Sequence, residues 1–442
     1  MSMTCKSGGS SLADVTQCLK TFAIVRKNGY RYFLPSAPGK RRPDDIKLTD
    51  EFKGLHAVAR VNRDATAVIL EKIKKRYDDI VQGLGIGLNL SREFEIIAER
   101  LSRGASLDYA MSRGEYLMGT VAANVLGWTY IDPADSVFID AKGRIDFVNT
   151  APVLIPAIGR AGGPVVISPF YGRSVETGEI KTLPRGGSDI SGSAVAKITR
   201  SERYDNLTDR DGMCAADPRI VPDARLIGRT SYRLSREFGL RGVSSEFIFH
   251  PEATIPVEDA GIPTWIRNTN NPTAAGTLLT VLDPADQPVL GITGRRECHL
   301  IEVSRRAMDD DVGDVGRALY VLARHGIPLR HISTGTESFS IIAYSSDVGT
   351  KAEEVECEIK SECEADVVSV SGDTISVLTV VGGGFHGVPG TLARFANALG
   401  RSGINVRTTD QGASELSFTF GVPRKDYEDG MRRLYAESCT CH

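Results

Sequence analysis

The sequence has no apolar run long enough to span a membrane, and its first residues have no apolar segment typical of a signal peptide. Only eight of the 442 residues are cysteine, and they are scattered along the chain. We therefore expect reduced thiols and a cytoplasmic protein that does not bind a membrane. The net charge is only −3, which argues against a basic surface that would bind nucleic acid. Among the seven histidines no Ser-His-Asp set or comparable catalytic group is evident.

What the sequence does contain is an ordinary globular composition, with 41% apolar and 25% charged residues. Strand and helix patterns alternate up to about residue 285, which predicts an α/β domain with a largely parallel sheet and helices on both faces. After about residue 289 a β-α-β-β-α-β order occurs twice. We expect domains at 1–285, 286–372 and 373–442, and leave open whether the first strand of the second domain is shared with the third.

A glycine loop opens a helix near the middle of the chain. Gly186 and Gly187 allow backbone amides to approach a ligand closely, and Ser188 or Asp189 can cap the helix that follows. The N-terminus of a helix attracts anions. Arg185 adds a planar fork suited to carboxylate or phosphate, and Asp189 adds a carboxylate that can hold a metal ion or a water molecule. A simple strand-to-helix connection is the alternative for this loop taken alone.

A second glycine loop lies near the N-terminus. Lys6 ends a short strand, and Ser7-Gly8-Gly9-Ser10-Ser11 precedes a helix that runs to about Lys27. This is the order of a phosphate-binding loop with a lysine on its entry strand, although the same composition is common in other loops. Further along, we expect Thr49-Asp50 to cap a helix and residues 51–104 to be helical throughout.

Two other groups of charged residues stand out. Glu115 is a lone acid at the start of an apolar helix, where a solvated face residue is the usual alternative. Asp209, Asp211 and Arg219 follow a predicted strand of the sheet. Because ligands bind at the carboxyl ends of strands in open α/β sheets, these side chains indicate a nucleotide or metal site.

Seven short motifs occur in one order along the chain. They are Lys6-x-Gly8-Gly9-Ser10-Ser11-Leu12-Ala13-Asp14, Ser112-Arg113-Gly114-Glu115, Arg185-Gly186-Gly187-Ser188-Asp189, Thr208-Asp209-x-Asp211-Gly212, Ala216-Asp217-Pro218-Arg219-Ile220-Val221, His250-Pro251 and Arg267-Asn268-Thr269. The tail adds Gly403-Ile404-Asn405-Val406-Arg407 and Gln411-Gly412-Ala413-Ser414-Glu415. Together they resemble the aspartokinases, a branch of the amino acid kinase family that carries paired ACT domains.

The resemblance implies a three-layer amino acid kinase fold with a mostly parallel central sheet, followed by two α+β, ferredoxin-like ACT domains. It also implies the reaction of ATP with L-aspartate to 4-phospho-L-aspartate and ADP, the entry step to lysine, threonine and methionine. The attacking carboxylate has a pKa of about 4 and is ionised at neutral pH, so no general base is needed. Two anions must meet, which calls for cations and amides around the transferred group. Lys6, the glycine amides and Mg²⁺ are expected to supply them.

The resemblance also implies roles for individual residues. The expected catalytic residues are Lys6 and Asp189, the latter for Mg²⁺ or for orienting Lys6. The expected substrate-binding residues are Thr49, Glu115, Arg185 and Ser188. The expected ATP-binding residues are Gly8, Gly9, Ser10, Gly186, Gly187, Thr208, Asp209, Met213, Asp217 and Arg219. The expected effector-binding residues are His331, Thr336, Glu337, Asn405 and Gln411. No separate metal site is assigned to the protein.

The chain departs from the family pattern at several positions. Ser7 replaces a common phenylalanine, Pro184 a common glycine, and Phe247 a lysine that often precedes the His-Pro pair. Met213 stands where an aromatic is frequent, and His331 where lysine-sensitive members carry an acid. Two alternatives to an aspartate kinase follow: a related kinase acting on another carboxylate substrate, or a weakly catalytic amino acid sensor.

The resemblance further predicts partners. Lysine or threonine is an expected effector. We expect the two ACT units of one chain to pair with those of a second, which gives a homodimer or a larger homo-oligomer.

Overall fold

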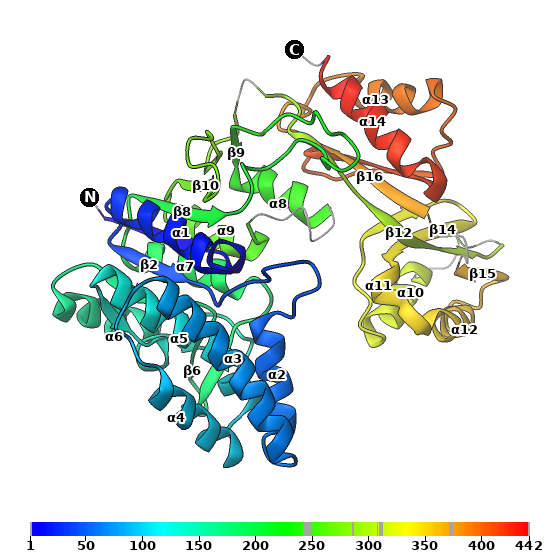
Figure 1. Ribbon diagram of the computed structural model, residues 1–442. Helices are drawn as coiled ribbons and strands as arrows, with labels where there is room; N and C mark the ends of the chain where they lie inside the picture. Colours follow the sequence, from blue (N-terminus) through cyan, green and yellow to red (C-terminus); the bar gives the residue numbers. More distant parts are fainter. Residues whose placement is uncertain are drawn as a thin grey trace. The chain divides into compact units, whose positions relative to one another are not determined.

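The computed structural model describes residues 2–241, 249–284, 287–306, 308, 313–370 and 375–440 (Figure 1). The chain divides into two compact units. The first unit contains Met1–Met213, Leu226–Tyr232 and Ile248–Leu282, and the second contains Cys214–Arg225, Arg233–Phe247 and Asp283–His442. The domain boundaries expected at 285/286 and 372/373 fall outside the described residues. No helix in the described ranges has both the length and the apolarity needed to cross a bilayer.

The first unit is built on eight strands in the order β3-β5-β2-β1-β8-β10-β11-β9. They are β1 (Met3–Ser7), β2 (Tyr32–Pro35), β3 (Thr129–Ile131), β5 (Val165–Ile167), β8 (Arg203–Thr208), β9 (Arg229–Ser231), β10 (Thr264–Asn268) and β11 (Thr277–Thr280). Neighbours from β3 to β10 pair in parallel, and β11 runs antiparallel to β10. A small sheet contains β4 (Phe138–Ile139), β6 (Tyr171–Ser174) and β7 (Ile180–Thr182). The predicted, mostly parallel sheet is confirmed.

Helices cover both faces of this sheet. They are α1 (Val15–Lys27), α2 (Leu48–Val58), α3 (Arg63–Gly83), α4 (Ser91–Ser102), α5 (Leu107–Leu126), α6 (Phe147–Ala161), α7 (Gly187–Ile198) and α9 (Pro251–Asp259), whereas α8 (Tyr232–Arg241) belongs to the second unit from Arg233 on. Successive side chains of a strand point to opposite faces. In β2, Phe33 joins the core formed with α1 to α5, whereas Tyr32 and Leu34 join the core formed with α6 and α7. The three-layer fold follows from this alternation.

Several local predictions need correction. Residues 51–104 form parts of three helices rather than one, because the side chain of Asn62 caps α3 by accepting from Ala65 N. Lys47 is the N-cap of α2, so Thr49 and Asp50 lie inside its first turn. Glu115 lies in the middle of α5, which begins at Leu107.

The N-cap of α7 also differs from the prediction. Gly186 occupies it with φ +84°, so Ser188 and Asp189 lie inside the first turn. Glycine reaches this left-handed conformation without the strain that a Cβ would add.

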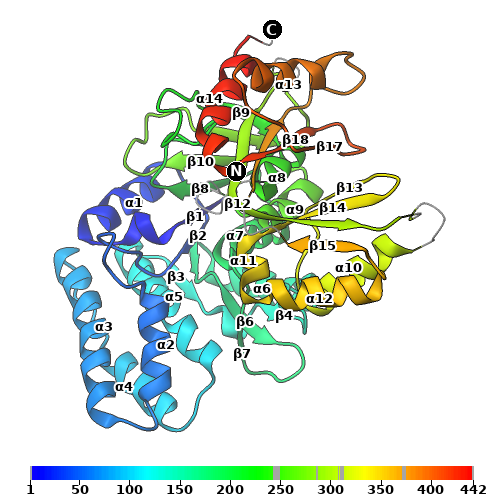
Figure 2. The same ribbon diagram turned by 90° about the vertical axis from the view of Figure 1, so that its right-hand side faces the viewer.

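The second unit carries one antiparallel sheet in the order β13-β14-β12-β16-β18-β17, with β15 also paired to β12. Its strands are β12 (Gly291–Ser304), β13 (His331–Thr334), β14 (Ser338–Tyr344), β15 (Val367–Val370), β16 (Ile375–Val381), β17 (Thr408–Gln411) and β18 (Ser417–Pro423). Its helices are α10 (Asp314–Arg324), α11 (Ser345–Val348), α12 (Ala352–Glu362), α13 (Thr391–Arg401) and α14 (Tyr427–Ser438). Figure 2 shows α10 and α12 together beneath β14 and β15.

Strand β12 belongs to both halves of this sheet. Its first half pairs with β16, and its second half pairs with β14 and β15. The register shifts between Arg295 and Cys298, so a bulge separates the two halves. One long strand thereby joins the two α+β copies.

Candidate functional site

A cavity of about 970 Å³ opens in the first unit. Of the residues predicted for catalysis or binding, it is lined by Lys6, Gly8, Gly9, Ser10, Thr49, Glu115, Arg185, Gly186, Gly187, Ser188, Asp189 and Asp209. These predicted residues come from five separate parts of the chain: the end of β1 with the loop after it, the start of α2, the middle of α5, the start of α7 with the loop before it, and the residue after β8. The fold therefore brings distant motifs to one place.

The cavity is rich in positive charge. Its lining holds seven Lys or Arg residues and four Asp or Glu residues. Lys40 and Arg41 come from the basic loop that follows β2. Phe247, where the family often has a lysine, lies outside the described residues. An excess of cations suits a ligand with several negative charges.

Lys6 and Asp189 form the central ion pair of the cavity. Lys6 Nζ lies 2.5 Å from Asp189 Oδ1, and both side chains are largely buried. Asn206 Nδ2 also donates to Oδ1, at 3.4 Å, and His250 N donates to Oδ2, at 3.3 Å. With three donors on its carboxylate, Asp189 fixes the direction of the lysine ammonium.

The two glycine loops approach their neighbours closely. A Cβ on Gly9 would lie 2.8 Å from the carbonyl oxygen of Ala37, and a Cβ on Gly186 would lie 2.8 Å from Cβ of His250. Neither position tolerates a larger residue without movement of the backbone or of the histidine.

Not every predicted amide is available to a ligand. Gly8 N donates to Leu207 O at 3.0 Å, and Gly187 N donates to Pro184 O at 2.9 Å. These two amides thus already have backbone acceptors in this structure, and their contact with the transferred group stays a prediction. The amides of Ser188 and Asp189, in the first turn of α7, have no acceptor four residues back within the helix and remain suited to an anion.

Glu115 lines the same cavity and is buried, with 4% of the residue exposed. Ala37 N donates to Oε1 at 3.3 Å, and no hydrogen-bond partner of Oε2 is found among the described residues. Burial raises the pKa of Glu115 to about 7. Gly114 permits the close approach, because a Cβ there would lie 2.9 Å from the Ala37 side chain. This carboxyl is suited to a cationic group that enters the cavity.

Arg185 is exposed at the cavity wall, and no ion-pair partner of its guanidinium is found in the part of the chain that the structure describes. Thr49 from α2 and Ser188 from α7 add hydroxyls to the same lining. The Glu115 carboxyl, the Arg185 guanidinium and these two hydroxyls are a fitting set for an amino acid, which carries both an ammonium and a carboxylate.

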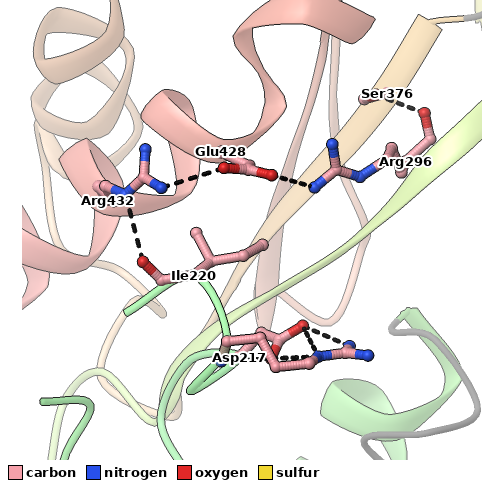
Figure 3. Close-up of polar contacts among 7 residues, drawn as sticks. Asp217, Ile220, Arg296, Ser376, Glu428 and Arg432 are labelled. Atoms are coloured by element: carbon pink, nitrogen blue, oxygen red, sulfur yellow. Dashed lines mark hydrogen bonds and ion pairs between the residues drawn. The ribbon is translucent and has the colours of Figure 1, made fainter. Parts of the chain in front are cut away.

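The remaining nucleotide-side residues divide between the two units. Asp209 lines the cavity and accepts from Thr208 Oγ1 at 3.2 Å. Met213 is buried and does not line the cavity. Asp217 and Arg219 belong to the second unit, where their side chains pair at 2.5 Å (Figure 3).

The predicted effector residues lie in the second unit. His331 Nδ1 is 3.0 Å from Asp410 Oδ2, and Ser333 Oγ is 3.1 Å from Thr408 Oγ1, so β13 and β17 contact each other through side chains. The exposed members of the set are Thr336, Glu337, Asn405 and Gln411. Gln411 lines a groove of about 540 Å³ beside the start of α13.

Sequence reasoning gave no role at the site to four residues that shape the cavity, although it singled out the motif that contains one of them, His250. Ala37 and Gly39 place the loop after β2, and Asn206 and the His250 amide hold Asp189. The His250-Pro251 motif was a usable signal, because proline in the first turn marks the start of α9. Backbone contacts such as that of Ala37 leave no signal in the residue type.

Comparison with known proteins agrees with this geometry. Residues 5–268 match the model of the amino acid kinase family, and residues 378–437 match that of an ACT domain. Aspartokinase 3 of Bacillus subtilis is 30% identical over 98% of this chain and 97% of its own length. The crystal structure of Clostridium acetobutylicum aspartate kinase has a TM-score of 0.91 at 32% identity, covering 99% of this chain and all of that one.

A third relative shows the same fold at lower identity. Escherichia coli aspartokinase III, in complex with aspartate and ADP, has a TM-score of 0.77 at 22% identity and covers 99% of both chains.

Proposed function

The chain belongs to the amino acid kinase family and, within it, to the aspartokinases, and from this membership we propose that it transfers the γ-phosphoryl group of ATP to the side-chain carboxylate of L-aspartate. The observation that carries the proposal is the single cavity that gathers the Lys6–Asp189 pair, Glu115 and Arg185. The product is 4-phospho-L-aspartate, and the ACT domains regulate the enzyme.

Each group has a distinct task in this reaction. Glu115 binds the substrate ammonium, and Arg185 clamps the α-carboxylate with its planar fork. An oxygen of the side-chain carboxylate then forms a bond to the γ-phosphorus, and the bond from that phosphorus to the β,γ-bridging oxygen breaks, so ADP leaves. Lys6, held by Asp189, and the first amides of α7 offset the charge of the transferred group.

Magnesium fits this site as a companion of the nucleotide. Among the described residues no group of three or more His, Cys, Asp or Glu could hold a metal ion. Mg²⁺ in kinases needs only one or two carboxylates besides phosphates and waters, and Asp209 offers one at the cavity wall. When bound, Mg²⁺ supplies positive charge to the nucleotide phosphates. Asp189 is already paired with Lys6, so we assign it the orienting role.

The direct test is trapping of the acyl phosphate. Purified protein incubated with Mg-ATP, L-aspartate and hydroxylamine is expected to give aspartyl hydroxamate and ADP in equal amounts. A panel of other amino and carboxylic acids in place of aspartate measures the substrate preference. Folded protein that gives no hydroxamate above a blank would refute the proposal.

The pKa of Glu115 predicts a pH dependence. The free carboxyl has a pKa of about 7, and only its ionised form attracts the substrate ammonium. About a tenth of the sites are ionised at pH 6 and about nine tenths at pH 8, so kcat/KM for aspartate should rise about tenfold over this range and then level off. The profile is measured at saturating Mg-ATP. A flat profile between pH 6 and 8 would contradict the assignment of Glu115.

We also propose an assembly and an effector. Two chains pair through their ACT units, with lysine or threonine bound at that regulatory region, in the cytoplasm. Light scattering at micromolar concentration should report at least twice the 47.8 kDa of one chain. A mass of one chain at that concentration is the result that would contradict this arrangement.

A further inference from the structure

Arg76 is a buried cation on a helix face that otherwise packs into the core. Helix α3 lies beside α2 (Figure 2), and its buried residues follow the spacing of one helix face: Ile73, Arg76, Tyr77, Ile80 and Val81. Only 5% of Arg76 is exposed. An apolar residue at this position would pack α3 without the cost of removing a charge from water. The contacts of the guanidinium therefore point to a specific role.

The guanidinium of Arg76 connects two segments next to the cavity. One nitrogen donates to the carbonyl oxygen of Gly39, in the β2–α2 loop (residues 36–47), and to Ala13 O at 3.4 Å, at the end of the glycine segment that follows β1. The other nitrogen lies 3.8 Å from Asp45 Oδ2, in the same β2–α2 loop. One side chain of α3 thus holds this loop at two places.

Asp45 stays charged beside Arg76. Arg41 donates to both oxygens of the Asp45 carboxylate, at 2.9 and 3.2 Å. These hydrogen bonds hold the pKa of Asp45 well below its usual range. The ionised carboxylate offsets part of the cost of burying the Arg76 guanidinium.

The β2–α2 loop connects this anchor to the substrate site. Gly39 N donates to Gly9 O at 2.8 Å, and a Cβ on Gly39 would lie 2.5 Å from the carbonyl carbon of Gly9, so the two backbones are in contact. Earlier in the same loop, Ala37 N donates to Oε1 of Glu115 at 3.3 Å. The carbonyl that Arg76 holds is therefore close in the chain to the amide that holds Glu115.

We propose that Arg76 is a positioning residue for the amino acid substrate: it fixes the β2–α2 loop against the glycine loop, and the β2–α2 loop in turn fixes the Glu115 carboxylate. The inference rests on the proposed function for the role of Glu115. Arg76 does not itself line the cavity, so it acts through the loop.

The replacement Arg76→Met tests this role, because it keeps an apolar stem on the buried face of α3 and removes the guanidinium. At pH 8 and saturating Mg-ATP, kcat/KM for aspartate should fall about tenfold, since a displaced carboxylate holds the ammonium less well. The midpoint of its pH profile, expected near pH 7 for wild type, should rise by about half a unit to one unit. The reason is that the Ala37 amide favours the ionised form of Glu115.

The other groups around Glu115 are unchanged in this variant. Arg113, on the same helix, also favours the ionised carboxylate. Tyr77 of α3 donates to Gly114 O at 2.7 Å, and burial holds its pKa well above the usual value, so it stays neutral. Outside the β2–α2 loop, the other charged residues of the cavity lining are Lys6, Asp50, Lys53, Arg185, Asp189 and Asp209.

The matched control is Arg173→Met. Arg173 of β6 also donates to a backbone carbonyl, Ala134 O at 2.9 Å, and also pairs with an aspartate, Asp135, at 3.3 Å, but none of these three residues lines the cavity. This control should leave kcat/KM and the midpoint unchanged. Arg76→Lys keeps the charge and loses the planar fork, so it should change both quantities in the same direction by about half as much.

Two results would overturn the inference. One is a folded Arg76→Met protein with the kcat/KM and midpoint of wild type. The other is full recovery of both quantities by Arg76→Lys, because charge alone would then be sufficient. If Arg76→Met does not fold, Arg76→Lys decides by the same two measurements.

A measurement without turnover separates this inference from the proposed function. If the wild-type chain fails the hydroxamate test, the proposed function is refuted, and the pKa of Glu115 still reports its position. The difference in stability between each protein and its Glu115→Gln counterpart levels off above the pKa of the folded state. Thermal unfolding should place that pH about half a unit to one unit higher for Arg76→Met than for wild type, and an equal pH for both would overturn the inference.

Discussion

Replacement of Lys6 by methionine should lower kcat by about 1000-fold and leave KM for aspartate nearly unchanged. The methionine keeps the apolar stem in place at the end of β1 and removes only the ammonium. Asp189 would then retain Asn206 and the His250 amide as donors but no cation. Removal of one preorganised cation from phosphoryl transfer costs a factor of this size, because no water can replace it in the transition state.

The control for this variant is Lys75→Met. Lys75 lies on α3 with 74% of its side chain exposed, and it pairs with Asp79 across one helical turn. Surface pairs of this kind contribute little to stability, so the control should keep full activity. The variant Lys6→Met/Asp189→Asn should regain any stability lost by the single change and none of the activity. A folded Lys6→Met enzyme with kcat within tenfold of wild type would exclude a catalytic role for this lysine.

Much of this site was predictable because paired glycines next to charged side chains occur in few structural settings. Gly186 and Gly187 next to Arg185 and Asp189 indicated an anion site at a helix start, and all four line one cavity in the structure. The parallel sheet was predictable for a similar reason. Buried strands alternating with helices leave few other arrangements.

What the sequence did not predict depends on contacts between distant backbones. Gly9 closely approaches the loop that contains Ala37. Both residues lie in loops, which have no periodic pattern of apolar residues, so the sequence gives no sign of this contact. Helix α6 was overlooked because Pro152 and Pro156 lie inside it, and internal proline normally marks a helix end.

The prediction with the largest effect on stability concerns Glu115. Its carboxyl has a pKa of about 7 in the folded protein against a usual value of 4.5. The folded state therefore holds more protons than the unfolded state between these two pH values. The wild-type protein loses stability as pH rises through that window, and the full loss, on the order of 3 kcal/mol, is reached above pH 7. Glu115→Gln removes the titration and keeps the acceptor for the Ala37 amide, so it should stabilise the protein near pH 8 and not near pH 4.

The same change should abolish the attraction for the substrate ammonium. Loss of a charged partner costs about 1.5–3 kcal/mol, so KM for aspartate should rise between about 10-fold and 150-fold, with KM for ATP unchanged. Thermal unfolding at pH 4.5, 6 and 8 measures the first effect, and kinetics at pH 8 measure the second. Glu95→Gln, on the exposed face of α4, should show neither. If the difference in stability between Glu115→Gln and wild type were the same at pH 4.5 and at pH 8, the carboxyl would not be titrating near neutrality. If it bound aspartate as wild type does, the ammonium would lie elsewhere. Because one buried group produces both effects, they must occur together: the carboxyl that destabilises the empty cavity at pH 8 is the one that an incoming ammonium neutralises.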